Sequence, residues 1–113
     1  MITNFKNKVA KWLKYYNREF IVIEKSNDIA GLWRYREDDY GVMEFTHINV
    51  SKYNYCYSDH SFPSQSIDFP HHSDMYKYVK SYVEKNDLIS HIKFNHEVKE
   101  VNGIYEISFL HLF

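Results

Sequence analysis

The stretch IVIEKSNDIAGLWR, residues 21–34, decides how this chain folds. An apolar run over residues 20–23 leads directly into Glu24, and a polar turn then leads to the letters AGLW at residues 30–33. A short apolar run bounded by turn residues is typical of a buried strand. The sequence therefore predicts a buried strand over residues 20–23 that ends at a carboxylate.

A helix is predicted before this strand, over residues 7–16, and residues 17–19 then form a tight turn. Apolar side chains recur there at helical spacing, with lysines between them on the predicted solvated face. The apolar set is Val9, Trp12, Leu13 and Tyr16, and the lysines are Lys8, Lys11 and Lys14. Helix, turn, buried strand and acid follow in the order of the second half of a βαβ unit. This order predicts the α/β class.

An acid at the end of such a strand is where a Rossmann-type domain holds a ribose, about 20 residues after a glycine-rich turn. Counting back from Glu24 places that turn within the first few residues. Residues 1–8 contain no strand-like run and no glycine, and the first glycine of the chain is Gly31. We therefore expect residues 1–113 to form one incomplete Rossmann-like domain that lacks the first strand and the glycine-rich loop.

A second helix is predicted over residues 74–86. Ser73 can cap it, and its apolar face is Met75, Val79, Tyr82 and Val83. Residues 42–50 are rich in strand-forming side chains and are expected to be extended, whereas residues 58–70 hold both prolines and are expected to be a loop. Short strands are predicted at residues 91–95, 97–101 and 104–109, with a hairpin turn at residues 102–103, an Asn-Gly pair.

The composition narrows the possible functions. A net charge of −1 gives no general attraction to nucleic acid. One cysteine, Cys56, excludes an internal disulfide and favours a reducing, cytoplasmic location. No apolar run is long enough for a transmembrane helix, and the first residues do not resemble a signal peptide. Adjacent His71 and His72 do not have zinc-ligand spacing, so no metal site is predicted.

Three blocks of this sequence resemble the flavin-containing monooxygenase family. IEKSNDIAGLWR is similar to that family's E-K-S-x-D-x-G-G-L-W segment. INVSKYNYCYSDHSFP resembles its T-N-x-x-K…Y-x-D-F-P-F-P stretch, and DFPHHSDMYKYVKSYVEKNDLISHIKFNHEV resembles its D-F-P…H-x-x-x-x-x-Y-L…I-x-F-x-x-x-V stretch. The in-register residues of the second block are Asn49, Lys52, Tyr57, Asp59, Phe62 and Pro63. The blocks keep their order over residues 20–101.

This resemblance implies a partial FAD- and NAD(P)-binding domain. Family members bind FAD, are reduced by NADPH and oxygenate soft nucleophiles such as amines and sulfides. The resemblance places Glu24 on the adenosine ribose, with Leu32 and Trp33 along FAD. The residues that would border the flavin ring are Ile48, Asn49 and Val50, and the catalytic residue among them is Asn49, beside the flavin and the nicotinamide. Ala30 departs from the family's first glycine.

Three interpretations of activity follow from the resemblance and from the missing loop. In the first, the chain is a truncated family member that is inactive alone and binds neither FAD nor NADPH tightly. In the second, it is a component of a split flavoprotein monooxygenase whose missing strand and glycine loop come from another chain. In the third, it is a non-enzymatic interaction protein. A gene model interrupted by a frameshift would give the same sequence, and the substrate is not indicated.

Overall fold

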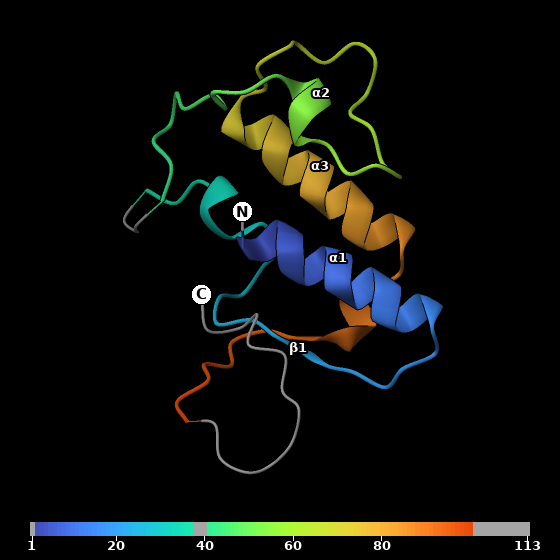
Figure 1. Cartoon of the computed structure of the whole chain (residues 1–113). Helices are drawn as coiled ribbons and strands as arrows, with labels where there is room; N and C mark the ends of the chain where they lie inside the picture. The colour runs from blue at the N-terminus through green and yellow to red at the C-terminus, as the bar shows by residue number, and fades with distance from the viewer. Residues whose placement is uncertain (1, 38–40, 101–113) are drawn as a thin grey trace.

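The computed structural model describes residues 2–37 and 41–100, and Figure 1 shows their arrangement. The helices are α1 (Ile2–Tyr15), α2 (Lys52–Tyr55) and α3 (His72–Lys85); the 3-10 helices are η1 (Gly31–Trp33) and η2 (Ile89–His91); the strands are β1 (Val22–Ile23) and β2 (Ile92–Lys93). Helices α1 and α3 lie side by side, and β1 runs below α1 in Figure 1.

The sheet of the described residues is small and parallel. Val22 lies opposite Ile92, and Ile23 lies opposite Lys93. The pairing continues past the strand ends, because the Glu24 N–H donates to the Lys93 carbonyl over 3.0 Å and the His96 N–H donates to the Glu24 carbonyl over 3.0 Å. Helices with a parallel strand pair are compatible with the predicted α/β class, in partial form.

Helix α1 begins at Ile2, earlier than the predicted start at residue 7. It ends where Asn17 adopts a left-handed φ of 54°, which asparagine tolerates well, and the Arg18 N–H donates to the Leu13 carbonyl over 2.9 Å. The positions at which a glycine-rich turn is expected from the spacing to Glu24 are therefore helical.

The face of α1 that packs on the core differs from the predicted one. Over residues 6–15 of the helix, the buried residues are Asn7 and Ala10, at 3% and 2% exposure. Trp12 and Tyr16 are 41% and 65% exposed, whereas Val9 and Leu13 are half-buried, so the predicted apolar stripe lies at the edge of the packed face and is partly exposed. It lines a shallow groove of about 420 Å³ bounded by Val9, Trp12, Leu13, Tyr16 and Arg18. The small Ala10 lets α1 approach its neighbours closely, which the larger stripe residues do not.

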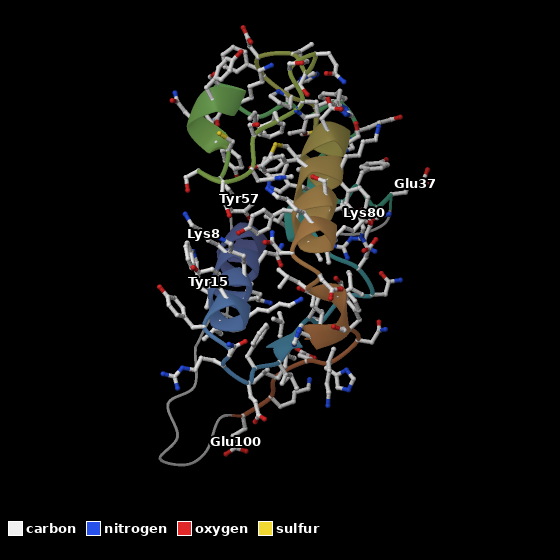
Figure 2. The ribbon with its side chains drawn as sticks, turned by 90° about the vertical axis from the view of Figure 1, so that its right-hand side faces the viewer. Lys8, Tyr15, Glu37, Tyr57, Lys80 and Glu100 are labelled. Atoms are coloured by element: carbon white, nitrogen blue, oxygen red, sulfur yellow. The ribbon has the colours of Figure 1, made fainter. Side chains whose placement is uncertain are left out.

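The lysines of α1 also differ from the predicted solvated face. Lys11 pairs with Asp59 at 2.8 Å. Lys14 donates to the Asn86 carbonyl over 3.1 Å and pairs with Asp87 at 3.2 Å, beyond the C-terminus of α3. Lys8 is exposed as expected, and Figure 2 shows it with Tyr15 on the outer side of α1.

Helix α3 forms the centre of the core, as its periodicity predicts. The predicted face of Met75, Val79, Tyr82 and Val83 is fully buried. The predicted cap is wrong: the helix begins at His72, and the N-cap is His71, whose side chain accepts a hydrogen bond from the Ser73 N–H. The imidazole of His71 therefore caps the helix in place of the Ser73 hydroxyl.

The segment expected to be extended, residues 42–50, and the described part of the strand predicted at residues 97–101 do not form strands. The only bridge of residues 42–50 among the described residues joins His47 to His71. The strand predicted at residues 91–95 is present as the short β2, which follows η2. Residues 58–70 are a loop with turns, as predicted. The predicted hairpin turn at residues 102–103 and the strand at 104–109 lie outside the described residues.

Candidate functional site

Glu24 follows β1 directly, and both oxygens of its carboxylate are engaged. Oε1 accepts a hydrogen bond from the Ser26 N–H over 3.0 Å. Oε2 lies 3.5 Å from the ammonium of Lys6, which also donates to the Ile23 carbonyl over 3.2 Å. The Lys6 and Glu24 side chains are only 11% and 15% exposed. The carboxylate is therefore held at the carboxyl end of β1.

The Ser26 hydroxyl lies between the Glu24 carboxylate and the turn that follows. It lies 3.1 Å from Glu24 Oε1 and 2.7 Å from the Asp28 carbonyl. A serine hydroxyl has one hydrogen to donate, and the nearer Asp28 carbonyl is the better acceptor. The backbone N–H of Ser26 is consequently the firm donor to Glu24.

Asp28 anchors the turn to α3. The Ile29 N–H donates to its Oδ1 over 2.8 Å, and the Tyr76 hydroxyl donates to its Oδ2 over 2.6 Å. Arg34 Nη1 lies 3.6 Å from the same Oδ2. Partial burial raises the pKa of Asp28, but the hydrogen bonds and the Arg34 charge outweigh it, so that the pKa lies below its ordinary value. The charged carboxylate fixes where η1 begins.

The backbone at Ala30 is in the left-handed region, with φ 75°, and its side chain is fully buried. Gly31 follows with φ 50°, and the Trp33 N–H donates to the Ala30 carbonyl over 3.0 Å. An L residue with a Cβ costs roughly 1–2 kcal/mol in this conformation. Ala30 thus occupies a position suited to glycine.

The side chains of η1 differ in exposure. Leu32 is 50% exposed, whereas Trp33 is partly buried and packs edge-on against Tyr55, with ring centroids 6.1 Å apart. The Trp33 Nε1 and the Tyr55 hydroxyl are buried and make no hydrogen bond of standard geometry among the described residues. Burial raises the pKa of Tyr55, and the nearby Trp33 N–H offsets part of that rise. An indole N–H without an acceptor is a donor that a ligand oxygen can satisfy.

The predicted flavin-bordering segment lies on a separate loop. Ile48 is buried, and its N–H donates to the Pro70 carbonyl over 3.0 Å. Asn49 is exposed and Val50 is 38% exposed. Ser51 then caps α2. The fold therefore places Glu24, Leu32 and Trp33 on one continuous segment and presents Asn49 from another.

The histidines at the start of α3 have structural partners. The Nε2 atoms of His71 and His72 lie 2.7 and 2.8 Å from the Glu44 carbonyl. Within residues 2–37 and 41–100, no cluster of three or more His, Cys, Asp or Glu side chains could hold a metal ion. In that same part of the chain, no helix is long and apolar enough to cross a membrane.

Sequence reasoning missed Lys6, Asp28 and Tyr76. Lys6 lies before the predicted start of the first helix, and no local signal pairs it with Glu24. Asp28 was quoted within a motif, but its partner Tyr76 lies 48 positions away. Only the packed fold brings these side chains together.

Comparison with known proteins identifies the class. Residues 15–109 match the model of the family described as flavin-binding monooxygenase-like. The chain belongs to this family. Flavin-containing monooxygenase 5 of Rattus norvegicus is 33% identical over 87 residues, 74% of this chain. Flavin-containing monooxygenase 3 of Homo sapiens is 32% identical over 83 residues, 70% of this chain. Dimethylaniline monooxygenase (N-oxide-forming) 4 of Oryctolagus cuniculus is 37% identical over 82 residues, 69% of this chain.

These alignments cover a small part of each relative. The matched stretch is 16%, 16% and 15% of the length of the three relatives, respectively. The chain therefore corresponds to one segment of the proteins it matches.

Proposed function

We propose that this chain forms the adenosine-binding part of a flavin-containing monooxygenase-type enzyme and is inactive by itself. The observation that carries the proposal is the carboxylate of Glu24, held at the carboxyl end of a parallel strand and followed by the turn to Trp33. Ligands of parallel α/β sheets bind outside the carboxyl ends of the strands. The family's activity, FAD- and NADPH-dependent N- and S-oxygenation, is proposed for the enzyme that contains this segment.

The residues of this chain fit FAD in part. Glu24 would accept hydrogen bonds from the ribose, Leu32 and Trp33 would lie along the cofactor, and the buried Trp33 N–H offers a donor. Asn49 would lie beside the flavin ring and the nicotinamide, with Ile48 and Val50 bordering it. The flavin, when bound, supplies the redox chemistry. Asn49 can both donate and accept a hydrogen bond, which suits orienting a ring with polar edges.

The pyrophosphate of a dinucleotide normally binds backbone N–H groups at a glycine loop and the helix that follows. Here the expected loop positions lie within α1, and Lys6 is directed to the Ile23 carbonyl and Glu24. Hydrogen bonds to charged groups contribute about 1.5–3 kcal/mol each. Two or three missing bonds weaken binding by at least a few orders of magnitude, since each 1.4 kcal/mol is about tenfold.

The test is a flavin absorbance spectrum of the purified chain, followed by calorimetric titration with FAD and an NADPH oxidation assay. We expect no co-purified flavin, no NADPH oxidation and no micromolar FAD binding. Glu24→Ala is compared with Glu19→Ala, which alters an exposed acid before β1. Micromolar or tighter binding that Glu24→Ala abolishes and Glu19→Ala preserves would overturn the proposal of an inactive chain.

A second candidate function is a component of a split flavoprotein, completed by another chain with the missing strand and glycine loop. The exposed apolar stripe on α1 favours it, because this surface could cover an added strand. Its test is to mix the chain with a polypeptide that carries a family-type strand and glycine loop, and to measure FAD binding by the mixture. A non-enzymatic interaction protein would bind a partner through the same stripe, and the mixture would bind no FAD.

A further inference from the structure

The ion pair between Lys6 and Glu24 limits the access of a ligand to the Glu24 carboxylate. The residue proposed to bind ribose hydroxyls needs its carboxylate oxygens as acceptors. Oε1 already accepts from the Ser26 N–H, and Oε2 faces the Lys6 ammonium at 3.5 Å. A carboxylate has about four lone-pair sites, so Oε1 can accept again beside the Ser26 N–H, but Oε2 is covered by the Lys6 ammonium and the two side chains are only 11% and 15% exposed. A cis-diol that donates to both oxygens therefore has to reach Oε2 where a donor already lies. The Ser26 N–H is part of the backbone turn, so the side chain that can leave is Lys6.

Lys6 is well held in this position. Its ammonium donates to the Ile23 carbonyl over 3.2 Å, and its side chain is only 11% exposed. An ammonium has three donors, so it can keep the Ile23 bond when it leaves Glu24. The pair is thus a local contact that can open without unfolding α1 or β1.

We infer that Lys6 competes with ribose hydroxyls for the Glu24 carboxylate and so determines how strongly this site binds a ribonucleoside. The inference rests on the proposed role of Glu24. The ligand class is a nucleoside with a free 2′,3′-diol, since two adjacent hydroxyls can donate to both oxygens of one carboxylate. Lys6 acts here as a specificity-determining residue that nothing in the sequence pattern indicates.

The experiment measures adenosine binding to the full chain by NMR titration, because adenosine carries the diol without a phosphate that could itself attract Lys6. The variant is Lys6→Gln, whose amide can still donate to a carbonyl but carries no charge. We expect its adenosine affinity to exceed that of the wild type by about two- to fivefold, within the usual range for one ion pair. The matched control is Lys8→Gln, on the exposed side of α1, which should leave the affinity unchanged.

Two further measurements test whether the gain in adenosine affinity depends on the ligand hydroxyls and on the Glu24 carboxylate. With 2′,3′-dideoxyadenosine, Lys6→Gln should give no gain, because the ligand lacks both hydroxyls. In the double variant Lys6→Gln with Glu24→Gln, the gain with adenosine should disappear. Thermal unfolding monitors the fold of every variant, and Lys6→Met, of similar length, replaces Lys6→Gln if the latter is unfolded.

The outcomes separate the two proposals. Equal adenosine affinity of wild type and Lys6→Gln, with binding that still depends on Glu24, overturns the competition and leaves the role of Glu24 intact. Adenosine binding that is absent from every variant, or that Glu24→Gln does not change, overturns the role of Glu24 itself. A gain with adenosine that the dideoxy ligand shares would also contradict the competition, since it would not involve the diol.

Discussion

The hydroxyl of Tyr76 donates to Oδ2 of Asp28 over 2.6 Å, which joins α3 to the turn that carries Trp33. The two residues are 48 positions apart. This one bond sets the position of the candidate cofactor-binding turn relative to the core helix. Arg34, at the far end of η1, approaches the same oxygen and completes the anchor.

Removal of this bond should destabilise the fold. Tyr76→Phe keeps the ring and deletes the donor to a charged acceptor, so we expect a loss of about 1–2 kcal/mol in the free energy of unfolding, measured with urea. Tyr53→Phe is the control, because Tyr53 is 72% exposed and should change nothing measurable. Equal unfolding midpoints for Tyr76→Phe and the wild type would contradict the anchor.

The same anchor predicts a pH dependence. Because the pKa of Asp28 is lowered in the folded chain, the unfolded chain binds a proton more readily near the ordinary value of 3.8. The contribution of Asp28 is therefore present above this value and is lost as the pH falls through the folded pKa. We expect Asp28→Asn to unfold more easily at pH 7 and to show a smaller loss of stability below pH 4 than the wild type. Acid-unfolding curves of the same shape for Asp28→Asn and the wild type would contradict this contribution of Asp28.

Two buried tyrosines of α3 should respond in opposite ways to loss of the hydroxyl. The Tyr78 hydroxyl accepts from the Tyr57 N–H over 2.7 Å and donates to the His60 carbonyl. The Tyr82 hydroxyl is buried and has no hydrogen-bond partner among the described residues. Tyr78→Phe should cost about 1–3 kcal/mol because it removes a buried hydroxyl that makes two hydrogen bonds, whereas Tyr82→Phe should be neutral or stabilising.

Thermal and urea unfolding of the two variants provides the comparison. Each variant serves as the control for the other, since both remove one oxygen from the same buried aromatic cluster. A loss for Tyr82→Phe as large as that for Tyr78→Phe would show that the Tyr82 hydroxyl does make a stabilising contact.

The left-handed backbone at Ala30 should favour glycine over residues with a side chain. Ala30→Gly relieves roughly 1–2 kcal/mol of strain and loses about 0.8 kcal/mol of buried methyl, so we expect stability equal to the wild type or up to about 1 kcal/mol higher. Ala30→Val adds a branched side chain at a fully buried position with φ 75°, and we expect a loss of more than about 2 kcal/mol. The order Gly, Ala, Val of decreasing stability is the result to check by urea unfolding; Val above Ala would refute it.

Because apolar side chains of α1 are exposed, we expect the isolated chain to self-associate. We also expect its stability to be low. We expect a thermal midpoint below about 60 °C, within the mesophilic range, and sedimentation that depends on concentration. Trp12→Gln should reduce the association without lowering the midpoint, because Trp12 is 41% exposed. Phe45→Gln changes a 75% exposed residue outside the groove and serves as the control. A monomeric wild type with a cooperative transition above 60 °C would contradict both expectations.

The sequence predicted those parts of the fold that local periodicity determines. The buried face of α3 follows the recurrence of Met75, Val79 and Val83, and the position of Glu24 follows the order of helix, turn and strand. The packing face of α1 was wrong because size, not polarity, decides it: Ala10 permits close approach, and Asn7 is buried although polar. Residues 42–50 have strand propensity, but a strand also needs a partner with matching register, which local composition does not contain.

The residues of the candidate site come from motif resemblance. Motif resemblance gave Glu24, Leu32 and Trp33 on one segment and Asn49 on another, and their roles toward FAD stay predictions. The contacts that control the site were not predictable, because Lys6 reaches Glu24 from a different element and Tyr76 reaches Asp28 from α3. Such pairs depend on how α1, β1 and α3 are placed in three dimensions.

Helix α1 is attached by the ends of three lysines to three separate parts of the chain: Lys6 to β1 and Glu24, Lys11 to Asp59, and Lys14 to the residues after α3. Dissolved ions screen exposed charges far more than partly buried ones. The Lys14 and Asp87 side chains are 37% and 85% exposed, whereas the lysines of the other two pairs are only 11% and 17% exposed. Moderate salt should therefore accelerate amide hydrogen exchange first at the end of α1 near Lys14, while exchange along α3 stays slow.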